Sequence, residues 1–134
     1  MDQDKDKTVN FVIVPTMTER EVVDLLLNRF PDVRDRVCPE EYYFELPTVV
    51  YDSLATIAVE RADDPGFMQS VALFIDELAE SKDRLLQEVL IVSLLEGIAE
   101  NEQVARVVSR MISPRSKSLL HEVERDFYHR KPSE

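Results

Sequence analysis

The chain has 134 residues, of which 44% are apolar, and this is enough for one domain to bury a core without a metal or a disulfide staple. Its 16 basic and 27 acidic side chains give a formal charge of −11, which repels phosphate backbones and anionic lipid headgroups. Two glycines and no tryptophan argue against a turn-rich β-sandwich or barrel, so we expect an all-α protein with no nucleic acid and no membrane among its partners.

The N-terminal region differs from the rest of the chain. Residues 1–7 are charged and are predicted to be disordered, whereas residues 8–130 are predicted to form a single helical domain. The stretch TVNFVIV at 8–14 is β-branched and predicts a short extended segment. Its apolar part is too short for a signal-peptide core, and the single cysteine excludes an intramolecular disulfide, so we expect a cytoplasmic protein.

The first two predicted helices are marked by their boundary residues. Thr18 and Glu21 have the spacing of a capping box, and Pro31 ends the first helix after residue 30, because proline cannot continue a helix. The irregular stretch that follows is expected to be a loop or a short helix. Pro47 suits a first helical position, so a second helix should begin there and continue to about residue 61.

The third and fourth predicted helices form the apolar centre of the chain. The sequence DDPG at 63–66 precedes the third helix, which should end near residue 80. A fourth helix is predicted to reach about residue 100, and 9 of the 14 residues at 85–98 are Leu, Ile or Val. This pattern predicts the most buried helix of the protein. Gly97 inside it indicates a close contact with another helix.

Two shorter segments complete the predicted fold. A fifth helix is expected over residues 102–112, and Ser113 followed by Pro114 should start a sixth helix that packs Leu120, Val123 and Phe127 inward. The short linkers make successive helices antiparallel neighbours. The predicted architecture is an antiparallel stack of about six helices, either a closed bundle or a HEAT-like stack.

The sequence contains no recognisable catalytic motif. His121 and Glu124 have the spacing of two metal ligands on one helix, but no second pair of ligands is present in a known motif. Cys38 has no histidine nearby in the sequence, and two glycines cannot build most phosphate-binding loops. We therefore predict that the protein is not an enzyme and needs no cofactor and no metal.

The candidate binding residues are acidic and aromatic. The segment EEYYFE at 40–45 combines carboxylates, which complement a basic site, with tyrosines, which give a large contact area. An alternative is that its rings cover the core while its acids are solvated. The third helix should group a second set of carboxylates on one exposed face. The predicted partner-binding residues are Glu40, Glu41, Tyr42, Tyr43, Glu45, Asp76, Glu77 and Glu80.

The acidic charge is unevenly distributed along the chain. Residues 32–104 carry 5 basic and 17 acidic side chains, whereas residues 105–131 carry 7 basic and 3 acidic side chains. Ordinary solvated helix faces would explain this distribution, because acidic residues favour solubility. An acidic surface that binds a basic partner would explain it equally well.

Three stretches carry a resemblance to a known group of proteins. They are VVDLLLNRFPDV at 22–33, VLIVSLLEGIAE at 89–100 and ISPRSKSLLHEVERDF at 112–127. Together they resemble an uncharacterised family of small bacterial all-helical domains that look like immunity proteins of polymorphic or contact-delivered toxin systems. The resemblance supplies no catalytic residues. It implies an inhibitor that neutralises a cognate toxin, whose active-site cleft we expect to be basic.

Two other classes of function remain alternatives. A helical adaptor or regulatory binding protein would have the same composition as an inhibitor. A small-ligand-binding protein or an enzyme would need a pocket with convergent polar groups, and no such group is visible in the sequence.

Overall fold

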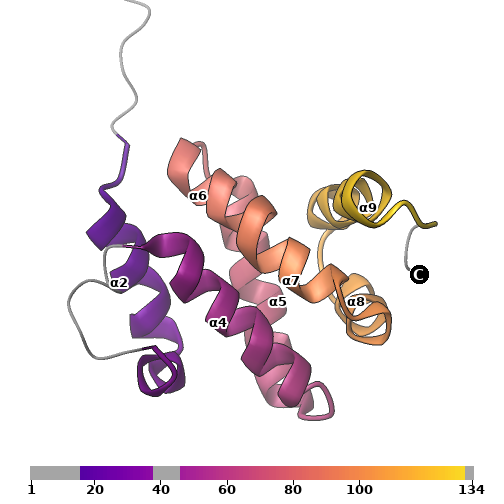
Figure 1. Ribbon diagram of the computed structural model, residues 1–134, viewed down its shortest axis with the longest axis horizontal. Coiled ribbons are helices and arrows are strands. Elements are labelled where there is room, and N and C mark those ends of the chain that lie inside the picture. The colour runs from indigo at the N-terminus through magenta and orange to yellow at the C-terminus, as the bar shows by residue number, and fades with distance from the viewer. Residues whose placement is uncertain (1–15, 38–45, 132–134) are drawn as a thin grey trace, which may run out of the picture.

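A computed structural model describes residues 16–37 and 46–131, and this part of the chain folds into helices without any strand (Figure 1). The all-α prediction is therefore confirmed. The predicted disorder at 1–7 and the extended segment at 8–14 lie outside the described residues. The elements in chain order are α2 (Glu19–Arg29), the short 3₁₀ helix η1 (Pro31–Asp35), α4 (Pro47–Glu60), α5 (Pro65–Glu80), α6 (Arg84–Val89), the π-helical η2 (Leu90–Leu95), α7 (Glu96–Ala99), α8 (Glu102–Ser109) and α9 (Pro114–Tyr128).

Polar side chains fix where most of these helices begin. At the start of α2, the Thr18 hydroxyl accepts a hydrogen bond from the Glu21 amide at 3.1 Å, and the Glu21 carboxylate accepts one from the Thr18 amide at 2.9 Å. This is the predicted capping box, which satisfies amides that have no partner inside the helix. The other residues whose side chains cap a helix N-terminus are Asp64, Asp83, Asn101 and Ser113.

The central helices lie side by side. Helices α6, η2 and α7 form one continuous run that lies beside α4 and points in the same direction (Figure 1). Helix α5 connects the end of α4 to the start of α6 through short linkers, so successive helices are antiparallel, as expected. On the other side of α4, the buried Tyr51 hydroxyl donates a hydrogen bond to the Val22 carbonyl of α2 at 2.9 Å. Helix α9 packs against α7 and α5.

The central run differs from the predicted fourth helix in two ways. Its middle, η2, is π-helical, which the apolar pattern does not reveal. Half of its residues are buried, but half of those in α4 are buried too, so the prediction that it is the most buried helix is wrong. Leu90 and Leu94 are fully buried, whereas Val92 is 46% exposed because the neighbouring helices leave its side of the run uncovered.

Helix α9 buries Leu120 and Val123 as predicted, but Phe127 is 50% exposed. The side chain that points inward instead is Glu124, which is fully buried. Its carboxylate is 2.8 Å from the Arg130 guanidinium, which also donates a hydrogen bond to the Ala99 carbonyl at 2.5 Å. An ion pair therefore takes the place that the sequence assigned to an aromatic ring.

No helix in the described part of the chain is both long enough and apolar enough to cross a membrane.

Candidate protein-binding surface

The first predicted binding segment is not described by the structure. Its five candidate residues, Glu40, Glu41, Tyr42, Tyr43 and Glu45, lie between η1 and α4, outside the described residues. Their role therefore stays a prediction.

The second predicted group, on α5, is not one exposed acidic face. Asp76 is half-buried, and its carboxylate accepts hydrogen bonds from the Ser113 amide at 2.9 Å and from the Ser116 hydroxyl at 2.7 Å. It therefore helps to cap α9, which packs over this side of α5. The prediction that Asp76 is exposed with its neighbours is wrong, because the start of another helix covers it.

The other two α5 carboxylates differ from each other. Glu77 forms a double hydrogen bond with the Arg29 guanidinium at 2.6 and 2.7 Å, and this guanidinium also lies 5.2 Å from the centre of the Phe74 ring. The hydrogen bond from Arg29 lowers the pKa of Glu77. Glu80 is exposed. Of the three predicted acids on α5, two therefore make contacts that hold helices together.

A different group of carboxylates meets between α4 and α7. A hollow of about 460 Å³ lies there, and we call it the α4–α7 groove. The acids that line it are Asp52 and Glu60 from α4 and Glu100 from the end of α7. Among the described residues, no basic side chain lines this groove. These acids lie up to 48 positions apart in the chain, so their spacing in the sequence does not reveal them as a group.

Gly97 explains why α4 and α7 come so close at this point. A Cβ atom at Gly97 would lie 2.6 Å from the Ala55 Cβ and 3.3 Å from an Asp52 carboxylate oxygen. Any side chain would therefore push the two helices apart. The predicted close contact at Gly97 is confirmed, and it was the one signal in the sequence that pointed to this groove.

The negative charge of Glu100 acts on two neighbouring groups. Burial raises the pKa of Asp52, and the negative charge of Glu100 raises it further. The pKa of Tyr128 is also raised, first by burial and then by the charges of Glu100 and Glu96. The Tyr128 hydroxyl donates a hydrogen bond to the Glu96 carbonyl at 3.1 Å, which places the phenol beside the start of α7. The charge of Arg130 lowers the pKa of Tyr128, but it does not outweigh burial and the acids.

The arginines around the groove already have acidic partners. Arg36 hydrogen-bonds to Glu60 at one end of the groove. The Arg61 guanidinium is 2.9 Å from the Asp32 carboxylate. Arg130 is bound to the buried acid of α9, as described above. Among the described residues, no ion pair involves Asp52 or Glu100, so two carboxylates at the groove lack a cation.

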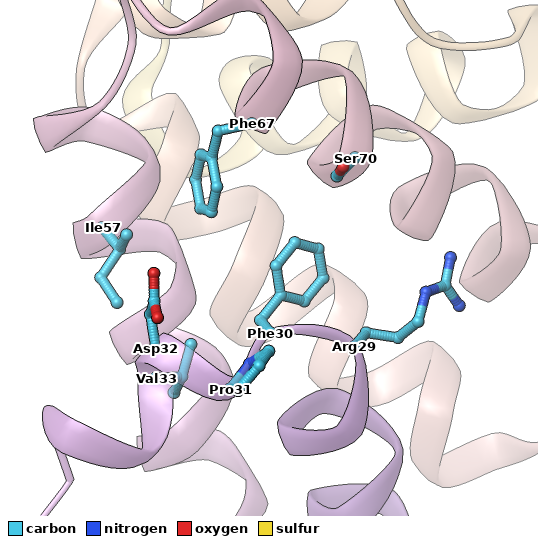
Figure 2. A pocket seen from close by; sticks show the side chains of 8 residues that line it. All are labelled: Arg29, Phe30, Pro31, Asp32, Val33, Ile57, Phe67 and Ser70. Atoms are coloured by element: carbon cyan, nitrogen blue, oxygen red, sulfur yellow. The ribbon is translucent and has the colours of Figure 1, made fainter.

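A second, smaller cleft lies where the end of α2 meets α4 and α5 (Figure 2). It has a volume of about 220 Å³, and the rings of Phe30 and Phe67 point into it with their centres 5.8 Å apart. Its charged lining residues are Arg29 and Asp32, and each is bound to a partner of opposite charge. The cleft therefore lacks the free, convergent polar groups that orient a small ligand.

The described residues contain no group of three or more His, Cys, Asp or Glu side chains placed to hold a metal ion. The pair considered in the sequence, His121 and Glu124, does not form such a group, and the glutamate is engaged with Arg130.

Comparison with known proteins places the chain in a family. Residues 23–129 match the domain of unknown function DUF7674. No curated protein and no solved structure matches the chain. Because the description of the domain names no function, the resemblance to immunity proteins stays a prediction.

Proposed function

The chain belongs to the DUF7674 family, and we propose that it is an immunity protein, which binds a cognate bacterial toxin and neutralises it through an acidic surface. The observation that carries the proposal is the α4–α7 groove, where Asp52 and Glu100 face a hollow that no basic side chain of the described residues lines. The pKa of Asp52 is raised by burial and then by the charge of Glu100, and a cation from a partner would relieve the second of these effects.

The overall charge supports a partner of this kind. A chain with a formal charge of −11 attracts basic proteins over long distances and accelerates their association. Toxins that act on anionic substrates such as nucleic acids need basic active-site clefts. An acidic protein that fills such a cleft competes with the substrate, so neutralisation needs only binding. We place the encounter in the cytoplasm, where a delivered toxin would act.

The proposal requires neither catalysis nor a cofactor. The apolar cleft at Phe30 and Phe67 supports this part of the proposal, because both of its charged residues are engaged in ion pairs. The buried Glu124 carboxylate is likewise engaged in an ion pair with Arg130, whereas a catalytic acid or base would have to be accessible to a substrate.

Co-expression with the product of the adjacent gene tests the proposal. We expect the adjacent product to arrest growth when expressed alone, and we expect this chain to restore growth and to co-purify with it. The double variant Asp52→Asn with Glu100→Gln should weaken the complex. The matched control is Glu88→Gln with Glu122→Gln, which removes the same charge from exposed positions outside the groove and should leave rescue unchanged.

A second variant separates the groove from the undescribed segment. Simultaneous alanine replacement of Glu40, Glu41, Tyr42, Tyr43 and Glu45 tests the binding site predicted from sequence. Rescue that survives this change removes that segment as the site. A neighbour that is bound but not toxic would favour the adaptor alternative, and one that is neither toxic nor bound would refute the immunity proposal.

A further inference from the structure

The α4–α7 groove continues beyond the end of α7. A second hollow of about 310 Å³ lies between the end of α4 and helix α8, and it shares Val59 and Asn101 with the first. The two hollows are therefore neighbours, and we call them together the extended groove. It runs beside α4 from Asp52 to the end of that helix at Glu60, about 12 Å at the rise of a helix, and continues past the turn that holds Ala62 and Asp63.

The extended groove is lined by apolar and by acidic side chains. The small and aliphatic ones come from α4, the turn after it and α8. They are Ala55, Val59, Ala62, Val104 and Val107. Three of them, Val59, Ala62 and Val107, remain half-exposed, so apolar surface is left for a partner to cover. The acidic lining residues are Asp52, Glu60, Glu100 and Asp63, and no basic side chain of the described residues lines either hollow.

Gly97 gives this groove its shape. The small size of Gly97 lets α7 approach Ala55 of α4 closely. Helix α8 begins directly after this contact, where the Asn101 side chain accepts a hydrogen bond from the Val104 amide at 3.0 Å. Asn101 and Val59 line both hollows, so the start of α8 lies where the two hollows meet.

We propose that the extended groove binds a basic amphipathic helix of the partner protein. Apolar side chains at helical spacing would cover Val59, Ala62 and Val107, and Lys or Arg side chains beside them would meet Asp52 and Glu100. An amphipathic helix presents such a pattern along its successive turns, so a helix lying beside α4 would reach both hollows. This inference rests on the proposed function, because it specifies the part of the toxin that is bound.

A synthetic peptide tests the groove without the toxin. The probe is a helix of about four turns with leucines on one face and lysines flanking them. Titrated into the isotopically labelled full chain, it should shift the amide resonances of Val59, Gly97, Asn101 and Val107. A peptide with glutamate in place of every lysine, and one with a central proline that breaks the helix, should each bind at least about ten-fold more weakly.

Variants of the full chain locate the site. Thr56 is exposed and lines the groove, so Thr56→Arg places a cation in it without disturbing the core and should weaken peptide binding by about ten-fold or more. Gln69→Arg adds the same charge at an exposed position of α5 that lines neither hollow, and it should leave binding unchanged. Circular dichroism of both variants checks that the helices are intact.

The outcomes separate this inference from the proposed function. No shifts at about 1 mM peptide, shifts spread over other helices, or equal binding of the glutamate peptide would each overturn the groove inference. Toxin neutralisation that survives Thr56→Arg would overturn it too, while the immunity proposal would stand. Peptide binding in the groove, together with a neighbouring gene product that is neither toxic nor bound, would keep the groove and refute the immunity proposal.

Discussion

Acidic side chains have opposite roles at two surfaces of the molecule. At the α9 interface, Asp76 accepts hydrogen bonds from the start of α9, and Glu124 is buried in an ion pair with Arg130 near its end. At the α4–α7 groove, Asp52 and Glu100 have no cationic partner among the described residues, and the pKa of Asp52 is raised by burial and by the charge of Glu100.

The difference shows that the partner of a carboxylate, and not its spacing in sequence, decides what it does. Asp76 and Asp52 are each part of a helix with apolar neighbours on one side. The first meets the amide of Ser113 and stabilises the fold. The second lies near another carboxylate, so no cation of the described residues neutralises its charge. Removing these carboxylates should therefore have unequal effects on stability.

The largest expected effect is at Glu124. Replacing it by alanine leaves Arg130 largely buried without its carboxylate, and breaking a buried pair in this way costs about 3 to 5 kcal/mol. Urea unfolding followed by circular dichroism measures the loss. Glu122→Ala is the control, because Glu122 is exposed on the same helix and its loss should cost less than about 0.5 kcal/mol. Equal losses in the two variants would contradict a structural role for the Glu124 pair.

Asp76 and Asp52 give the most direct test of the comparison. Asp76→Ala removes the acceptor of two hydrogen bonds and should lower the free energy of unfolding by about 2 kcal/mol. Asp52→Ala removes a carboxylate repelled by Glu100, so the free energy of unfolding should stay the same or rise. A destabilised Asp52→Ala protein, or an unaffected Asp76→Ala protein, would reverse the roles assigned to the two surfaces.

Gly97 tests whether the groove depends on close helix packing. Gly97→Ala should destabilise the protein by about 1 to 2 kcal/mol, although alanine is the better helix former, because its Cβ would meet that of Ala55 at 2.6 Å. Gly66 in the first turn of α5 is the matched control. A Cβ there would find its nearest atom at 3.7 Å, so Gly66→Ala should be neutral or slightly stabilising. Thermal unfolding of both variants measures the difference in sign.

The smallest expected effect is a difference in pH dependence. Asp52 has a raised pKa, so its ionisation penalises the folded state at neutral pH, and this penalty disappears as the pH falls through the folded-state pKa. Glu77 has a lowered pKa, so its contribution is present above the unfolded-state pKa and is lost as the pH falls through the folded-state pKa. At about pH 7, the Asp52→Asn variant should be more stable than the wild type, and the Glu77→Gln variant should be less stable than the wild type.

Both differences in the free energy of unfolding should shrink toward about pH 3. The difference for Glu77→Gln should stay below about 1 kcal/mol, because the Glu77–Arg29 pair is exposed. Urea unfolding at several pH values measures them. Differences of the same sign in both variants at neutral pH would show that the two acids do not have opposite roles.

The sequence by itself determined the helices and where they begin. Thr18, Asp64 and Ser113 cap helices that start where their spacing predicts, because a cap bonds to amides within the next three residues. Gly97 marked a close helix contact for an equally simple reason, since only a residue without a side chain fits there. These features depend on neighbours in the chain or on the size of one residue.

The tertiary structure alone decided which helix covers each face and which carboxylates it covers. It placed Asp76 under α9, turned Glu124 inward where Phe127 was expected, and brought Asp52 opposite Glu100 across 48 positions of sequence. Helical periodicity shows that a face exists, but it carries no information about which other helix packs on that face. The burial and the electrostatics of a carboxylate depend on that second helix, so the candidate groove became visible only in the folded chain.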